Sequence, residues 1–184
     1  MPLILQGATS GQTTIQATDA TTQTITLPAN SGTVLTSLST QSQLPANIAG
    51  NGPAFSAYQG GSQTISAGTY AKLQINTKEF DTNTNFDSTT NYRFTPTISG
   101  YYQVNGALSV TSSAQGYITI YKNGVAFKGG NNITVNGVSV TVSALIYFNG
   151  STDYIELYGY NSTSNAIITG AANTYFQASM VRGA

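Results

Sequence analysis

Apolar and polar side chains alternate along most of this chain with a period of two residues. The alternation is clearest at residues 117–121 and 138–142, and no window shows the sustained 3.6-residue apolar period of an amphipathic helix. Alternation of this kind is typical of β-strands with one buried face. Asn-Gly pairs lie at 123–124, 136–137 and 149–150, and this dipeptide suits the central positions of a tight turn. The pattern predicts an all-β chain with three hairpins and no long helix.

One break in the alternation is especially informative. Tyr92 and Phe94 alternate with polar residues, Pro96 follows them, and aromatic and branched residues resume after Gly100. Proline fixes its own φ and has no N–H for a ladder, whereas glycine tolerates positive φ. The chain is therefore expected to leave one strand and enter another here, with a positive φ at Gly100. Gly170 is interpreted as an ordinary loop glycine.

Residues 93–104, with the sequence RFTPTISGYYQV, resemble a segment of the complement component 1q globular head family. This family is a branch of the tumour necrosis factor superfold, and its R/K-F-T-x-x-x-x-G-x-Y-x-F/V run joins two strands of a jelly-roll sandwich. Further segments resemble the family in the same order, at 53–58, 78–81, 153–157 and 174–181. The resemblance implies a jelly-roll β-sandwich over residues 53–184.

The resemblance has two departures. Gln177-Ala178 stands where the family usually has Ser-Gly, and no collagen-like Gly-x-y stalk is present. The animal complement and adipokine branches are therefore poor guides to function.

The first part of the chain has a different character. Residues 7–17 and 23–36 alternate but carry too few apolar groups for a core of their own. They resemble a motif that recurs in tailed-bacteriophage fibres and other virion surface proteins, usually ahead of a distal domain. The resemblance implies a virion-attachment or shaft segment at 1–36. Its expected attachment residues are Ile15, Ile25, Leu27, Val34 and Leu35.

Residues 37–52 are rich in Ser, Gln, Asn and Pro and are predicted to form a linker to the head at 53–184. The start of the chain has neither a basic region nor a long apolar stretch, so a signal peptide or a membrane span is not expected there. A fully extended chain of about 50 residues reaches at most about 175 Å. This is short for a long tail fibre and favours a head fibre or a short tail-tip knob.

The composition argues against several classes of function. Charged residues make up 7% of the chain, six basic and six acidic, so attraction to nucleic acid or to an anionic membrane is not expected. The absence of His and Cys removes the Ser-His and Cys-His hydrolases and the usual zinc sites. Among the carboxylates, Asp153 and Glu156 are expected on opposite faces of one strand, which does not suit a glycosidase pair. The sequence predicts a protein that is not an enzyme and has no cofactor.

Asp81 and Asp87 are weak candidates for a calcium site. They bracket an oxygen-rich stretch at 82–86. A calcium ion takes six to eight oxygen ligands, so ordinary turn roles for these residues are favoured and no metal is predicted.

Aromatic residues that are neighbours in sequence must point to opposite faces of a strand. Pairs of this kind occur at 101–102, 147–148 and 175–176. A covered outer face would explain them, and the resemblance implies a homotrimer. The residues expected in the core or the trimer interface are Phe55, Tyr102, Tyr147, Ile155, Leu157, Tyr175 and Phe176. The alternative is that exposed tyrosines decorate a strand or bind sugar by stacking.

These observations predict a homotrimeric structural protein on the virion surface of a tailed phage. Its N-terminal segment would bind a capsid or tail protein, and its head would project as a surface fibre or a capsid-decorating knob. The alternative is a tail-fibre receptor-binding module that recognises polysaccharide or protein on the host surface. The sequence leaves the capsid or tail placement open.

Overall fold

The computed structural model describes residues 3–6, 12–15, 51–111, 115–133 and 139–184. The chain falls into two units, Met1–Thr36 and Ser37–Ala184. In the first unit, β1 (Leu3–Gln6) pairs antiparallel with β2 (Gln12–Ile15). Ile15 ends β2, but the other predicted attachment residues lie outside the described residues. Most of the predicted linker at 37–52 lies outside them too, so the attachment segment and the domain boundaries stay predictions.

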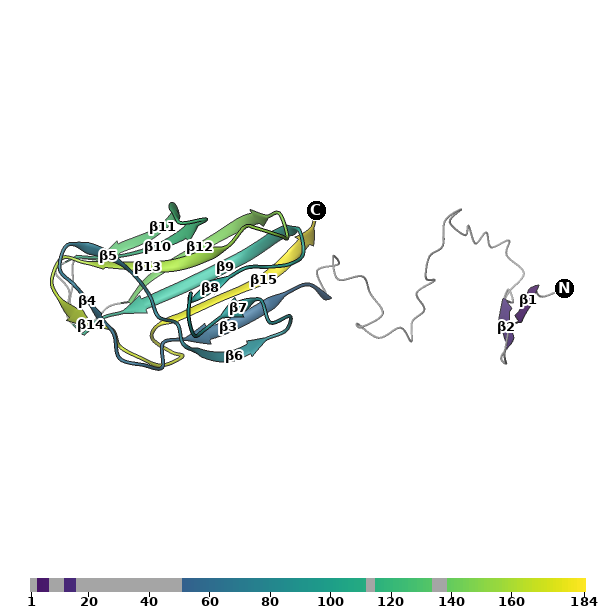
Figure 1. Cartoon of the computed structure of the whole chain (residues 1–184), viewed down its shortest axis with the longest axis horizontal. Coiled ribbons are helices and arrows are strands. Elements are labelled where there is room, and N and C mark those ends of the chain that lie inside the picture. The colour runs from purple at the N-terminus through teal and green to yellow at the C-terminus, as the bar shows by residue number, and fades with distance from the viewer. Residues whose placement is uncertain (1–2, 7–11, 16–50, 112–114, 134–138) are drawn as a thin grey trace. The chain divides into compact units, whose positions relative to one another are not determined.

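The second unit is a jelly-roll β-sandwich. One sheet has the order β12-β9-β15-β3-β6, and the other has the order β11-β10-β13-β8-β7 with β5 also paired to β13. Figure 1 shows β3 from the start of the unit, β9 from its middle and β15 from its end lying side by side. The strands are β3 (Ala54–Tyr58), β4 (Thr64–Ile65), β5 (Thr69–Lys72), β6 (Thr77–Asp81), β7 (Phe86–Asp87), β8 (Arg93–Phe94), β9 (Gly100–Ser109), β10 (Gly116–Lys122), β11 (Val125–Ile133), β12 (Ser139–Phe148), β13 (Ile155–Asn161), β14 (Asn165–Ala166) and β15 (Tyr175–Gly183).

The all-β jelly-roll prediction is confirmed, and no α-helix occurs in the described part of the chain. We refer to the two sheets as the five-stranded and the six-stranded sheet. The predicted strands at 117–121 and 138–142 correspond to β10 and to the start of β12. The break after Phe94 also lies where it was predicted. β8 ends at Phe94 in the six-stranded sheet, and the next strand, β9, begins at Gly100 in the five-stranded sheet.

Aromatic rings fill the space between the two sheets. The Phe55 ring lies 4.4 Å from that of Phe86, 4.6 Å from that of Phe94 and 5.3 Å from that of Phe176, measured between centroids. Tyr102 is also fully buried, and its hydroxyl donates to the Ile98 carbonyl at 2.8 Å. Burial raises the pKa of Tyr102 to about 12. Large rings contribute much apolar area to a core, so this cluster holds the two sheets together.

The three Asn-Gly pairs that were predicted to form hairpins have different outcomes. The pair at Asn123 and Gly124 joins β10 to β11 in a hairpin, with φ of 53° and 79°, as a type I′ turn requires. The pair at 136–137 lies outside the described residues. The third prediction is wrong, because Asn149 and Gly150 lie in a loop that carries the chain from β12 in one sheet to β13 in the other. There the Asn149 side-chain oxygen accepts bonds from the backbone N–H groups of residues 151–153.

One of two glycines differs from its predicted role. Gly100 has a positive φ of 159°, as predicted, and residues with a Cβ rarely adopt this conformation. A Cβ at this position would also lie 2.4 Å from the carbonyl oxygen of Arg182 on β15, so the close approach of two strands is a second reason for glycine. Gly170 has a φ of 106°. It is therefore a conformationally demanding position and not an ordinary loop glycine.

Candidate interaction surfaces

Sequence-adjacent aromatic residues divide between the core and the outside, as predicted. Tyr101 is 41% exposed beside a fully buried Tyr102, and Tyr147 is 44% exposed beside a fully buried Phe148. β9 and β12 pair in register so that Tyr101 lies opposite Tyr147, with ring centroids 5.5 Å apart. Aromatic side chains therefore lie on the outer face of the five-stranded sheet as well as in the core.

These two tyrosines belong to a larger exposed group that we call the apolar patch. Its members are Tyr101, Leu145, Tyr147 and Val181, all more than two fifths exposed. Tyr101, Leu145 and Val181 also line a shallow hollow of about 540 Å³ at the C-terminal end of β15. Contiguous exposed apolar surface of this kind marks interaction sites in soluble proteins.

The middle of the same face is polar. The Gln103 side-chain amide donates to the Ser143 hydroxyl at 2.9 Å, and that hydroxyl donates to the Asn105 side-chain oxygen at 2.8 Å. Gln103 and Asn105 also line a smaller hollow of about 210 Å³ with Gln177 and the half-exposed Phe80. The side-chain amides of Gln103 and Asn105 therefore bond to each other and to Ser143 without a ligand.

A second exposed apolar surface lies on β11, an edge strand of the six-stranded sheet. Val125 is 68% exposed and Phe127 is 47% exposed. The ammonium groups of Lys122 and Lys128 lie 5.9 and 5.1 Å from the Phe127 ring centroid. We call Val125 and Phe127 the edge surface.

The outer face of the six-stranded sheet carries tyrosines instead of aliphatic residues. Tyr160 on β13 is paired in register with Tyr117 on β10 and with Tyr70 on β5. Its ring centroid lies 5.5 Å from that of Tyr117 and 5.1 Å from that of Tyr70. We call Tyr117, Tyr160 and Tyr70 the tyrosine row.

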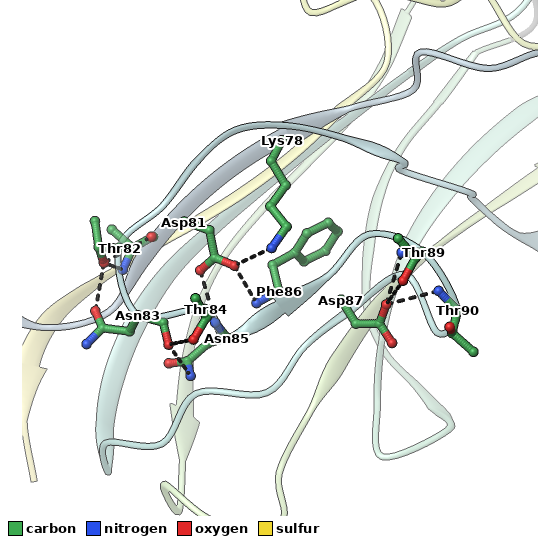
Figure 2. A network of polar contacts seen from close by, with 11 residues as sticks. Lys78, Asp81, Thr82, Asn83, Thr84, Asn85, Phe86, Asp87, Thr89 and Thr90 are labelled. Atoms are coloured by element: carbon green, nitrogen blue, oxygen red, sulfur yellow. Dashed lines mark hydrogen bonds and ion pairs between the residues drawn. The ribbon is translucent and has the colours of Figure 1, made fainter.

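Asp81 and Asp87 hold backbone turns and do not converge on a common point. Figure 2 shows two separate groups of contacts, one around each carboxylate. Asp81 accepts bonds from the N–H groups of Asn85 and Phe86 and pairs with Lys78 at 2.9 Å. No group of three or more acidic, His or Cys residues that could hold a metal occurs among the described residues.

Asp87 is held in the same way by its own loop. Its carboxylate accepts bonds from the backbone N–H groups of Thr89, Thr90 and Asn91. The bonds from Thr90 and Thr89 hold the pKa of Asp87 well below its usual range. A calcium ion would have to compete with these donors, so the geometry favours turn roles for both aspartates.

The remaining acidic pair is also separated. Asp153 lies in the loop before β13, rather than on a face of that strand, and its Oδ2 lies 2.9 Å from Lys122 Nζ. Burial acts to raise the pKa of Asp153, but bonds from Lys122, Asn123 and the Asn149 N–H outweigh it and lower the pKa. Glu156 lies in β13 and pairs with Lys72 at 2.5 Å. Each carboxylate thus has its own cation.

The residues predicted for the core or the trimer interface fall into two groups. The structure places Phe55, Tyr102, Ile155, Leu157 and Phe176 in the core of a single chain. Tyr147 and the half-buried Tyr175 lie on the outer side of the five-stranded sheet. The sequence analysis missed Leu145, Val181, the edge surface and Tyr70. Of these, only Leu145 could have been found from the local sequence, because it lies two residues before Tyr147 and therefore faces the same side of the strand.

The fold is shared with solved structures from animals and from a phage. The globular domain of zebrafish complement 1qA protein has a TM-score of 0.55 at 16% identity, covering 72% of this chain and 100% of that one. Murine APRIL has a TM-score of 0.56 at 6% identity, covering 70% and 98%. The PRD1 vertex protein P5 has a TM-score of 0.52 at 16% identity, covering 71% and 97%. At these identities the likeness shows the jelly-roll fold alone.

No protein-family model and no curated protein sequence matches the chain. None of the described residues forms a helix long and apolar enough to cross a membrane.

Proposed function

We propose that this chain is a non-enzymatic structural protein of a tailed-phage virion, a homotrimeric surface fibre or capsid-decorating knob anchored by its N-terminal segment. The observation that carries the proposal is the apolar patch. Tyr101, Leu145, Tyr147 and Val181 lie on the outer face of a sheet whose inner face already supplies the core. Covering such a patch with another copy removes apolar area from water and stabilises the assembly.

A cyclic arrangement fits the two exposed apolar surfaces of the chain. The apolar patch lies on a sheet face, whereas Val125 and Phe127 lie on the edge strand β11. Because the two surfaces differ, one copy can present its edge surface to the patch of the next copy. Head-to-tail contacts of this kind close into rings. We take the ring to be a trimer because of the fold shared with the solved structures.

The virion placement is supported by the fold and by the sequence motif at 7–36. The PRD1 vertex protein P5 has the same jelly-roll fold, so this fold is compatible with a place on a virion surface. The attachment segment would bind a capsid or tail protein. Labelling purified particles with antibodies to the head domain tests this placement. Label on the capsid or the tail is the expected result, and particles that lack the chain would contradict the proposal.

Light scattering on the full chain tests the assembly. The parent is expected to have the mass of a trimer at micromolar concentration, and Leu145→Asp is expected to lower it towards that of a monomer, because a charge would be buried in the contact. Tyr70→Asp is the matched control, since Tyr70 is 49% and Leu145 56% exposed on the outer faces of different sheets. The control is expected to stay trimeric. A monomeric parent would overturn the trimer.

The second candidate function is a receptor-binding module at the tip of a tail fibre that recognises polysaccharide or protein on the host surface. The tyrosine row favours it, because three aligned phenol rings on an outer face are not needed for the core.

A further inference from the structure

We propose that the tyrosine row is a binding platform for a neutral polysaccharide chain. The inference deepens the second candidate function above and rests on it. It names the surface and the chemical class of the ligand.

The row and Asn132 beside it cross four strands in register. Asn132 on β11 lies opposite Tyr117 on β10, Tyr117 opposite Tyr160 on β13, and Tyr160 opposite Tyr70 on β5. The Asn132 side-chain amide donates to the Tyr117 hydroxyl at 3.0 Å. Three strand spacings of about 4.8 Å give the row and Asn132 together a length of about 14 Å. This geometry suits an extended ligand that lies across the strands.

The rings of the row are held by one another. Tyr160 contacts Tyr117 in an edge-to-face arrangement and Tyr70 in a tilted one, so the ring planes are not stacked flat against each other. Tyr70 keeps 49% of its surface exposed. Rings fixed in this way lose little conformational entropy when a ligand binds.

The chemistry of the row matches that of a sugar. A pyranose ring has a face of C–H groups, which carry partial positive charge, and an edge of hydroxyl groups. The face of a phenol ring is electron-rich and attracts such C–H groups. The phenol hydroxyls and the Asn132 amide can both donate and accept bonds to sugar hydroxyls.

The charges around the row favour a neutral ligand. Neither Asn132 nor any tyrosine of the row is charged. The nearest cation in the register is Lys72, two residues along β5 from Tyr70, and it pairs with Glu156 at 2.5 Å. The Arg93 guanidinium lies 4.5 Å from the ring centroid of Tyr154 on the same face. These groups engage one another, so an anionic polymer would gain little from this surface.

The surface beside Tyr117 is low on the side of β11. Thr119 and Gly129 are paired in the next outward-facing position of β10 and β11, and a Cβ added at Gly129 would meet nothing within 4 Å. Sugar substituents that project from the ligand therefore have room next to Tyr117. A protein contact would instead be expected to fill such a depression, because protein interfaces are packed as closely as interiors.

Affinity electrophoresis of the full chain tests the proposal with four probes. Dextran, mannan and laminarin are neutral polymers, and dextran sulfate is the anionic counterpart of dextran. At least one neutral polymer is expected to retard the parent, and dextran sulfate is expected to have no stronger effect than dextran. Lack of retardation by every neutral polymer, or retardation by dextran sulfate alone, would overturn the proposal.

Substitutions in the tyrosine row test whether the polysaccharide binds there. Tyr160→Ala and Tyr70→Ala are each expected to weaken retardation at least tenfold, whereas Tyr160→Phe is expected to retain most of it, because the ring remains. Tyr70→Ala removes the least packing, so it remains informative if Tyr160→Ala fails to fold. Tyr92→Asn is the control, since Tyr92 lies in the loop before β8 and its φ of 50° suits asparagine. Alanine variants that bind like the parent would contradict the proposal.

Light scattering on the same variants separates this proposal from the proposed function. A trimer that binds none of the neutral polymers overturns the polysaccharide platform and leaves the trimeric virion protein standing. A monomer that binds them overturns the trimer alone. If Tyr70→Ala or Tyr160→Ala lowers the mass of the assembly, the row is a contact between copies and the polysaccharide proposal fails.

Discussion

The two sheets of the sandwich have unlike outer faces, although their inner faces build one core. The apolar patch on the five-stranded sheet combines Leu145 and Val181 with two tyrosines beside a hollow of about 540 Å³. The tyrosine row on the six-stranded sheet has amphipathic rings in register and an ion pair nearby. Aliphatic side chains gain most when water is fully excluded, whereas phenols can remain partly hydrated. The comparison suggests that one face suits a permanent contact and the other a reversible one.

The largest expected effect is a difference in stability between variants of two neighbouring aromatic residues, the buried Phe148 and the exposed Tyr147. Phe148→Ala should lower the free energy of unfolding by about 3–5 kcal/mol, because it empties space beside Tyr102 and Phe94 in the core. Tyr147→Ala on the apolar patch should cost a single chain much less and should lower the assembled mass instead. Chemical denaturation and light scattering at one protein concentration measure both. Equal losses of stability would contradict the division between core and patch.

The next effect concerns the strand pairing that carries the apolar patch. Gly100→Val should destabilise the head by about 2 kcal/mol or more, because overpacking forces backbone shifts of that cost, and here the obstacle is the Arg182 carbonyl. Gly129→Val is the matched control on the edge strand β11. Its Cβ would have open space, so the change should stay within about 0.5 kcal/mol. Thermal melts of the two variants measure the difference, and equal melting temperatures would show that β15 does not constrain Gly100.

Acid should weaken the side of the molecule that bears the apolar patch. The pKa of Asp153 in the folded protein lies below its ordinary value of 3.8. Its stabilising contribution is therefore complete above that value and is lost as the pH falls through 3.8 and below. Lys122, which pairs with Asp153, also donates to the Tyr147 carbonyl at 2.7 Å. Protonation of Asp153 thus releases a cation that helps to hold β12 at the patch.

Urea denaturation at a series of pH values measures this loss. The Asp153→Asn variant should lose less stability on acidification than the parent. The remaining loss in the variant includes Asp87, whose pKa is also lowered. Parallel pH profiles for parent and variant would show that the ion pair with Lys122 contributes nothing.

The sequence predicted the features that depend on neighbours in the chain. Period-two alternation gave β10 and β12, and it gave the opposite faces of Tyr147 and Phe148. The Asn-Gly signal is equally strong at 123–124 and 149–150, yet only the first is a hairpin. The difference lies in the following strand, because β13 belongs to the opposite sheet, and no local signal reports which sheet a strand joins.

The features that depend on strand pairing could not be predicted in the same way. The tyrosine row joins residues 70, 117 and 160, which become neighbours only through the register of β5, β10 and β13. Gly100 is constrained by a carbonyl eighty-two positions later, through the pairing of β9 and β15. Leu145 is the exception, because it lies two residues from Tyr147 on β12 and shares its outward parity. Each candidate surface therefore depends on non-local register more than on composition.

The smallest expected effect is a coupling energy within each face. A double-mutant cycle on Tyr70 and Tyr160 should give about 0.2–1 kcal/mol, the usual range for a cross-strand pair. The cycle on Tyr101 and Tyr147, which also lie opposite each other with centroids 5.5 Å apart, should give a similar value when the chain is monomeric. Only the second coupling should change with protein concentration, because the proposed assembly covers the apolar patch and leaves the tyrosine row uncovered. If the coupling of Tyr70 and Tyr160 also varied with concentration, the two faces would not differ in the way proposed, and the row would itself be a subunit contact.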